Sequence, residues 1–284
     1  MRAMIARNWF NAGARRYSST ESIKQLSNAV KPKRSTVDHT DVEHHTKLGE
    51  QWWDLKGEMR ALHGLNPLRV QLVRDGLANA GFKEANPVRP LEGVKILDVG
   101  CGGGILAEPL ARIGANVTGV DASSQLITIA KEHATLDPGL SGRLSYIHST
   151  VEEVAITHSE TFDAVVASEI LEHVSDPELF LKSCADTLKP GGSIFVTTFN
   201  KTLQSWLGGI LAAEYLFKLV PLGTHDWNKF ISPEETRRLL EKCGCKTKLI
   251  HGTFYNPLKN DWYWRESTAI NYAIHAIKQG ESSH

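Results

Sequence analysis

The 284-residue sequence lacks several features that would place it in a simple class. Its 32 basic and 32 acidic residues leave no formal net charge, so no overall basic field indicates nucleic acid and no acidic excess indicates disorder. No apolar run reaches the roughly 18 residues that a membrane-spanning helix needs. The four cysteines have neither zinc-site spacing nor the pattern of a disulfide framework, which favours a reducing compartment. The remaining composition, 41% hydrophobic and 23% charged, fits one large α/β domain with extensions, or at most two small domains.

Acidic residues are also absent from the first 20 positions, which carry four arginines together with alanines and serines. This composition is typical of a mitochondrial transit peptide, and residues 15–18 (Arg-Arg-Tyr-Ser) resemble a processing site with cleavage after Tyr17. A disordered basic tail is the alternative. We therefore expect a transit peptide over residues 1–17, a linker over 18–40 and one domain over 41–284.

Residues 96–104 (Ile-Leu-Asp-Val-Gly-Cys-Gly-Gly-Gly) combine an apolar strand, a glycine-rich turn and a helix start. Gly100 and Gly102 allow the backbone to approach a ligand, and N–H groups at the helix start can donate to it. A dinucleotide-binding loop would need its third glycine at position 105, which is Ile105, and no Gly-Lys-Ser/Thr end of a P-loop follows. What remains is Asp-x-Gly-x-Gly from Asp98, which resembles motif I of class I S-adenosylmethionine-dependent methyltransferases. A carboxylate there suits a cofactor with a sulfonium and an ammonium group.

A second acid follows the next predicted strand, over residues 116–121. Asp121 lies 21 residues after Gly100, close to the offset of roughly 20 residues at which a βαβ unit places a carboxylate on ribose hydroxyls. We therefore expect Asp121 to bind the ribose of the cofactor. Alternatively, Asp121 caps the helix that begins at Ala122, because aspartate is a common helix cap.

Strands and helices alternate through the rest of the domain. This alternation predicts a parallel sheet with right-handed crossovers and a ligand site at the carboxyl ends of the strands. Two helices are expected before the sheet, with Pro67 in the first turn of the second. Residues 243–278 are expected to hold the last two strands, joined through 256–258 and 261–264. The other expected elements are helices at 122–133 and 177–188, a short helix near 151, and strands at 143–148, 162–167 and 193–198.

The segment after the fourth strand carries candidate catalytic groups. If it begins a helix, Glu169, Glu172 and His173 stand at i, i+3 and i+4 on one face and could bind Mg²⁺, Mn²⁺ or Zn²⁺. A metal there would lower the pKa of a bound phenol or catechol. Alternatively, His173 or one carboxylate is a general base without a metal, since similar segments occur in many methyltransferases that need none.

An apolar segment at about 200–223 departs from the alternation. It is either a buried helical hairpin or an interfacial helix that lines the substrate entry and touches a membrane surface. His225 and Asp226 follow it and either reach the active site or only fix the loop.

The chain resembles the ubiquinone-biosynthesis O-methyltransferases over about residues 41–278. Beyond motif I, the marks are Trp-Trp-Asp at 52–54, Asn-Pro-Leu-Arg at 66–69, Ser-Glu-Ile-Leu-Glu-His-Val at 168–174 and Gly-Thr-His-Asp at 223–226. The resemblance implies a class I methyltransferase fold, a Rossmann-like α/β sheet that is mostly parallel, with helices on both faces and an antiparallel last strand. It also implies O-methylation of 3,4-dihydroxy-5-polyprenylbenzoate and of 3-demethylubiquinol.

The same resemblance implies residue roles and partners. It assigns cofactor contacts to Arg69, Gly100, Asp121 and Ser168, beside the Asp98 and Gly102 of motif I. It makes Glu169, Glu172 and His173 the ligands of a divalent metal, Mg²⁺. It implies peripheral attachment to the matrix side of the mitochondrial inner membrane, in a complex with other ubiquinone-biosynthesis proteins and without nucleic acid. The rival functions are a C-methyltransferase, an O-methyltransferase of small phenols, and a non-catalytic scaffold of the same fold.

Overall fold

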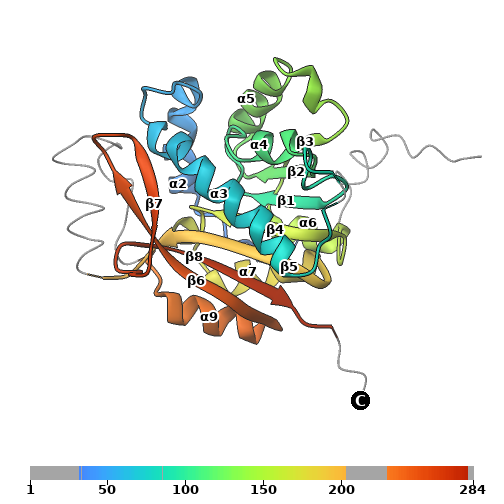
Figure 1. Ribbon diagram of the computed structural model, residues 1–284. Coiled ribbons are helices and arrows are strands. Elements are labelled where there is room, and N and C mark those ends of the chain that lie inside the picture. Colours follow the sequence, from blue (N-terminus) through green and yellow to red (C-terminus); the bar gives the residue numbers. More distant parts are fainter. Residues whose placement is uncertain (1–31, 33, 85, 203–228, 281–284) are drawn as a thin grey trace, which may run out of the picture. The chain divides into compact units, whose positions relative to one another are not determined.

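The computed structural model describes residues 32, 34–84, 86–202 and 229–280, which belong to one compact unit. Their strands form an eight-stranded sheet in the order β3-β2-β1-β4-β5-β8-β6-β7 (Figure 1). The expected transit peptide, the apolar segment beyond residue 202, and His225 and Asp226 lie outside the described residues. None of the described helices is both long and apolar enough to cross a bilayer.

Five strands of the sheet are parallel, as expected from the alternating pattern. The strand β8 is antiparallel to both of its neighbours, β5 and β6, which confirms the antiparallel last strand. The strands are β1 (Lys95–Val99), β2 (Asn116–Asp121), β3 (Leu144–His148), β4 (Phe162–Ser168), β5 (Leu188–Phe199), β6 (Cys245–Asn256), β7 (Asp261–Arg265) and β8 (Asn271–Lys278).

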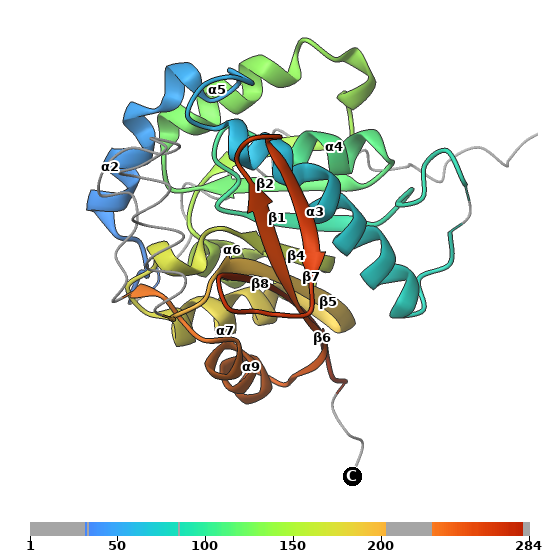
Figure 2. The ribbon, with the colours of Figure 1, turned by 60° about the vertical axis from the view of Figure 1, so that its left-hand side comes forward.

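Helices cover both faces of the sheet, and each face has its own core. One core joins Ile96 and Val117 to α3, α4 and α5; the other joins Leu97 and Val165 to α6, α7 and α9. Because the central strands are covered on both sides, they consist of nearly continuous apolar residues. Figures 1 and 2 show α3 running across one face. The helices are α2 (His39–Lys47), α3 (Arg60–Asn79), α4 (Ala107–Arg112), α5 (Ser124–Ala134), α6 (Val151–Thr157), α7 (Pro177–Thr187) and α9 (Pro233–Lys242).

The region before the sheet differs from the expectation of two simple helices. The first helix, α2, ends at Lys47 and is followed by the short 3₁₀ helix η1 (Gly49–Gln51). The second, α3, begins at Arg60, so Pro67 lies inside it and not in its first turn. Its buried side chains, from Leu65 to Leu77, continue on one face through the proline, and this packing outweighs the missing backbone donor.

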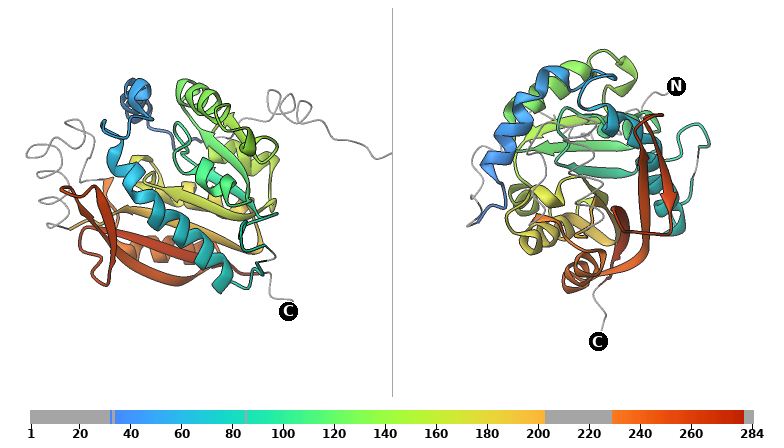
Figure 3. Two further views of the ribbon diagram at one scale, coloured as in Figure 1. Left: turned by 45° about the horizontal axis from the view of Figure 1, so that its top comes forward. Right: turned by 90° about the vertical axis from the view of Figure 1, so that its left-hand side faces the viewer.

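The region after α9 contains three strands where two were expected. Residues 261–265, expected to be part of a connection, form the strand β7, which pairs antiparallel with β6. The reason is a period-2 pattern: Trp262 is buried and its indole donates to Ala61 of α3, whereas the neighbouring Tyr263 is exposed. The resulting hairpin stands beside α3 (Figure 3).

Candidate active site

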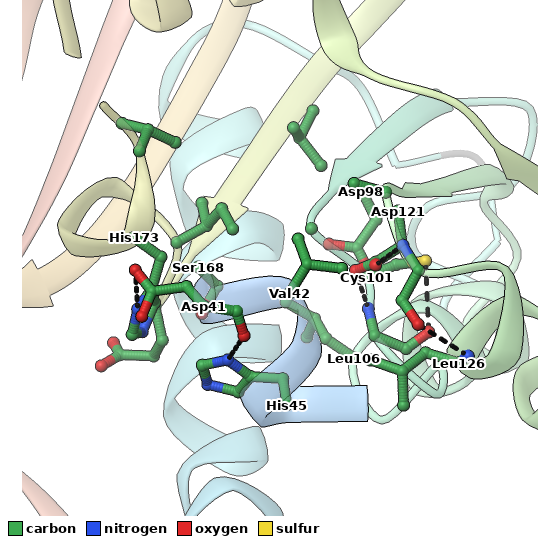
Figure 4. A pocket seen from close by; sticks show the side chains of 18 of the residues that line it. Asp41, Val42, His45, Asp98, Cys101, Leu106, Asp121, Leu126, Ser168 and His173 are labelled. Atoms are coloured by element: carbon green, nitrogen blue, oxygen red, sulfur yellow. Dashed lines mark hydrogen bonds and ion pairs between the residues drawn. The ribbon is translucent and has the colours of Figure 1, made fainter. Parts of the chain in front are cut away.

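All nine expected site residues line one cavity of about 250 Å³ at the carboxyl ends of β1, β2 and β4. In Figure 4, Asp98 and Asp121 lie together in one part of this cavity, and Asp41 and His173 lie together in another. The nine are Arg69, Asp98, Gly100, Gly102, Asp121, Ser168, Glu169, Glu172 and His173. Their convergence agrees with the rule that parallel sheets bind ligands where their strands end.

The glycine loop is packed more tightly than its sequence suggested. Gly100 and Gly102 have φ values of 70° and 52°, which favour glycine. A Cβ atom on Gly100 would lie 2.8 Å from the Ile170 side chain, and one on Gly102 would collide with the ring of Trp52. The N–H groups of Gly100 and Cys101 donate to the Val120 carbonyl. The neighbouring strand therefore takes these two N–H groups, and the expected donation from N–H groups at the helix start stays a prediction.

Asp98 and Arg69 form a buried pair of opposite charge with unused hydrogen-bonding atoms. Asp98 is 2% exposed, and its Oδ2 has no partner among the described residues. Burial raises the pKa of Asp98 to about 7, against the opposing charge of Arg69. The Arg69 guanidinium donates to the Leu62 carbonyl at 2.8 Å and to Ser168 Oγ at 3.2 Å, while its Nε has no partner within the described part of the chain. Burial lowers the pKa of Arg69 to about 10.

This donor set fits the amino-acid end of S-adenosylmethionine. A free carboxylate oxygen can accept from an ammonium group, and a free guanidinium N–H can donate to a carboxylate. Asp98 and Arg69 supply one of each within the same cavity.

Asp121 does not cap a helix, because Ser123 is the N-cap of α5 and accepts from the Leu126 N–H. One Asp121 oxygen accepts from the Gly102 N–H at 2.9 Å, and the other accepts from the Ser123 N–H at 2.8 Å. Burial raises the pKa of Asp121 above its usual value. Asp121 thus ties the glycine loop to the end of β2, and its contact with a ribose stays a prediction.

The segment with Glu169, Glu172 and His173 does not begin a regular helix, so the expected i, i+3, i+4 face is wrong. Glu169 has a left-handed φ of 53°, and only the short 3₁₀ helix η3 (Leu171–His173) follows. No group of three or more His, Cys, Asp or Glu side chains is gathered for a metal anywhere in the described part of the chain.

Each of the three side chains has a different partner. Burial and the charge of Glu172 raise the pKa of Glu169 to about 7, although a hydrogen bond with Thr197 opposes the rise. Glu172 is buried; one of its oxygens accepts from Thr198 Oγ1 at 2.6 Å, and the other has no partner among the described residues. His173 Nδ1 lies 3.7 Å from Asp41 Oδ2.

Residues of α2 line the cavity beside His173, and one of them pairs with a lysine before α9; the sequence analysis did not identify these residues as part of the site. Asp41 forms ion pairs with His173 and, at 2.7 Å, with Lys229, which also pairs with Asp38. Burial alone would lower the pKa of His173, but its contact with Asp41 raises it. His45 packs edge-on against the His173 ring, 4.7 Å between centroids. The spacing of Asp41 and His45 places them on one helix face, but no local pattern connects them to His173.

Comparisons with known proteins identify the family of the chain. Residues 97–196 match the family model described as "Methyltransferase domain". The ubiquinone biosynthesis O-methyltransferase of Chelativorans sp. is 41% identical over 87% of this chain and 96% of its own length. The mitochondrial ubiquinone biosynthesis O-methyltransferase of Mus musculus is 45% identical over 88% of this chain and 68% of its length, and that of Homo sapiens is 42% identical over 97% and 76%.

Solved structures support the fold. A SAM-dependent methyltransferase from Thermotoga maritima superposes with a TM-score of 0.56 at 18% identity, over 84% of this chain and 99% of its own. The magnesium protoporphyrin IX methyltransferase of Synechocystis has a TM-score of 0.53 at 16% identity, over 92% and 94%. These identities support a class I methyltransferase fold and nothing more specific. From the long matches at 41–45% identity, the chain belongs to the family of ubiquinone biosynthesis O-methyltransferases.

Proposed function

We propose that this chain transfers a methyl group from S-adenosylmethionine to ring hydroxyls of ubiquinone precursors, namely 3,4-dihydroxy-5-polyprenylbenzoate and 3-demethylubiquinol. The observation that carries the proposal is the buried Asp98–Arg69 pair, whose free atoms share one cavity with the carboxylates of Glu169 and Glu172. The names of the 41–45% identical relatives supply the pathway.

The cofactor, when bound, supplies a methyl group on a positively charged sulfur. In the reaction, the ring oxygen forms a bond to the methyl carbon as the carbon–sulfur bond breaks, and the hydroxyl proton goes to a base on the protein. Glu169 suits this role, because a pKa near 7 lets it accept a proton at neutral pH. His173, oriented by Asp41, is the second candidate. Arg69 and Asp98 would hold the cofactor's amino-acid end. The rest of the acceleration of methyl transfer would come from alignment of the ring oxygen, the methyl carbon and the sulfur.

The divalent metal is a separate proposal, with Mg²⁺ bound by Glu169, Glu172 and His173. The free Glu172 oxygen and the neighbouring Glu169 carboxylate favour a cation between them. His173 is engaged with Asp41, so the three residues as arranged do not form a ready ligand set, and no step above is routed through a metal. Full activity after exhaustive chelation would contradict the metal requirement.

The names of the mitochondrial relatives support a mitochondrial location for this chain. We infer import into mitochondria with removal of residues 1–17, and peripheral binding to the matrix side of the inner membrane beside other ubiquinone-biosynthesis proteins. Sequencing the N-terminus of the mature protein tests the first inference, and retention of Met1 would contradict it. Liposome flotation of a variant without residues 203–220 tests whether this apolar segment supplies membrane contact.

The experiment that tests the activity is transfer of labelled methyl from S-adenosylmethionine to a short-tailed 3,4-dihydroxybenzoate, with product analysis. We expect O-methylation of one ring hydroxyl, measured with and without Mg²⁺ after chelation. A product methylated on carbon would indicate the C-methyltransferase alternative, and equal rates on simple catechols would favour a small-phenol enzyme. Cofactor binding without transfer to any catechol would indicate a non-catalytic scaffold.

A further inference from the structure

The tandem tryptophans that follow η1 have different environments, although they are adjacent in sequence. The Trp53 ring stacks on His133, with 3.4 Å between centroids and 2° between planes, and its indole N–H donates to the Gly103 carbonyl at 3.0 Å. Trp53 does not line the cavity. The ring stacking and the hydrogen bond therefore explain Trp53 as a structural residue.

Trp52 lines the cavity and lies against the glycine loop. It is 6% exposed and packs with Met59, Ile105 and Leu126. A Cβ atom on Gly102 would collide with its ring, and one on Gly103 would lie 2.8 Å from its Nε1. The absence of side chains at these two positions therefore leaves room for the Trp52 indole beside the loop that Asp121 holds.

The indole N–H of Trp52 is buried and has no acceptor among the described residues. Buried tryptophan N–H groups usually have a partner, because a buried donor without an acceptor is destabilising. Trp262, which also lines the cavity, donates to the Ala61 carbonyl at 3.0 Å. Both oxygens of Asp121 already accept backbone N–H groups. The missing acceptor for Trp52 is thus best supplied by a ligand in the cavity.

We propose that the indole N–H of Trp52 donates a hydrogen bond to an oxygen of the bound cofactor, which makes Trp52 a cofactor-binding residue. The proposal rests on the proposed function, since it takes S-adenosylmethionine as the ligand. The acceptor is either the cofactor carboxylate or a ribose oxygen, because the indole packs on Gly102 and Gly103 in the cavity that Arg69, Asp98 and Asp121 also line.

The substitution Trp52→Phe keeps an aromatic ring and removes the N–H. Calorimetric titration should show binding of S-adenosylhomocysteine weakened by about 10-fold, as expected for the loss of one hydrogen bond. The ligand 5′-methylthioadenosine lacks the amino-acid end, so a loss seen only with S-adenosylhomocysteine identifies the carboxylate, and a loss with both identifies the ribose. Trp264→Phe is the matched control, because Trp264 donates to Gln71 and lies outside the cavity. Wild-type affinity of Trp52→Phe for both ligands would overturn the proposal.

A second measurement does not depend on how the variant folds. In the ¹⁵N-labelled wild-type protein, the assigned indole N–H resonance of Trp52 should move downfield on saturation with S-adenosylhomocysteine. An unchanged resonance at saturation, while backbone resonances of the glycine loop move, would overturn the role of Trp52 and leave the proposed function intact. If the wild-type protein does not bind S-adenosylhomocysteine at all, the proposed function itself fails.

Discussion

At the scale of single residues, Glu169 combines an uncommon backbone conformation with a raised pKa. A non-glycine residue with φ near 53° is strained by about 1 kcal/mol, and such strain is concentrated at functional sites. The two effects can be separated by substitution, because glycine relieves the strain and alanine retains it.

We predict that Glu169→Gly and Glu169→Ala both lower methyl transfer by about 100-fold or more, as expected for the loss of a general base. Glu169→Gly should be about 1 kcal/mol more stable than Glu169→Ala, because only glycine adopts this φ freely. Labelled-methyl assays and urea denaturation of both variants measure the two effects. Equal stabilities would show that the backbone at Glu169 is not strained. Unimpaired methyl transfer would show that Glu169 takes no part in the reaction.

Asp98 links cofactor binding to the pH dependence of stability. Its pKa is raised from 3.8 to about 7, so the folded protein binds a proton more tightly than the unfolded chain. This contribution to stability is fully present below pH 3.8 and is lost as the pH rises through 7. For the cofactor-free protein, the effect is at most about 4 kcal/mol.

We predict that Asp98→Asn loses less stability than wild type between pH 5 and pH 8, because the amide does not titrate. Urea denaturation at the two pH values measures the difference, and binding of S-adenosylhomocysteine at pH 8 should fall by about 10-fold or more. A stability loss equal to that of wild type would show that Asp98 titrates normally in the folded protein.

At the scale of elements, α2 lines the cavity and contacts η3, where Asp41 and His45 meet His173. Lys229 pairs with both Asp38 and Asp41, but only Asp41 also contacts His173. These partly exposed pairs contribute about 1 kcal/mol or less to stability, so their main effect is on the imidazole.

We predict that Asp41→Asn lowers the pKa of His173, because the contact with the Asp41 carboxylate raises that pKa more than the charge of Glu172 does. The ring-proton resonance of His173, followed through a pH titration by NMR, measures the change. Asp38→Asn is the matched control, since it removes a Lys229 partner without contacting His173 and should leave the His173 pKa unchanged. Equal shifts in the two variants would show that Lys229, and not direct contact, controls His173.

The crossing of α3 over the sheet depends on Gly76. A Cβ atom at this position would collide with the Phe195 ring of β5, so the helix lies close to the strand only without a side chain there. Alanine is the better helix former by about 1 kcal/mol, yet we predict that Gly76→Ala destabilises the protein by about 1–3 kcal/mol. Ala78→Gly, at an exposed site of the same helix, should cost only about 1 kcal/mol. Denaturation curves measure the stability of both variants. A Gly76→Ala variant more stable than wild type would show that the Phe195 ring moves to make room for the added methyl group.

At the scale of the whole molecule, the sequence predicted the structural features that depend on local patterns of residues. Apolar runs that end in an acid located Asp98 and Asp121 at the ends of β1 and β2, and the alternation of elements predicted the parallel sheet and its site. Local sequence patterns do not predict contacts between distant segments of the chain. Asp41 lines the cavity and forms an ion pair with Lys229, which is 188 residues away in the sequence.

Two further differences concern segments whose local patterns favoured a different structure. The segment after β4 allows a helix by composition, but the left-handed Glu169 breaks it, so Glu172 and His173 turn to Thr198 and Asp41. The helix pattern at Pro67 suggested a helix start, but the buried face of α3 extends back beyond it. In both places tertiary packing outweighs the local preference.

The most direct test of the account is a crystal structure with S-adenosylhomocysteine and a short-tailed 3,4-dihydroxybenzoate. We predict that the cofactor lies in the cavity at the ends of β1, β2 and β4, with its carboxylate at Arg69 and its ribose at Asp121. One ring hydroxyl should face the cofactor sulfur and lie within hydrogen-bond distance of Glu169 or His173. A cofactor bound elsewhere, or a ring whose hydroxyls all face away from the sulfur, would contradict the account.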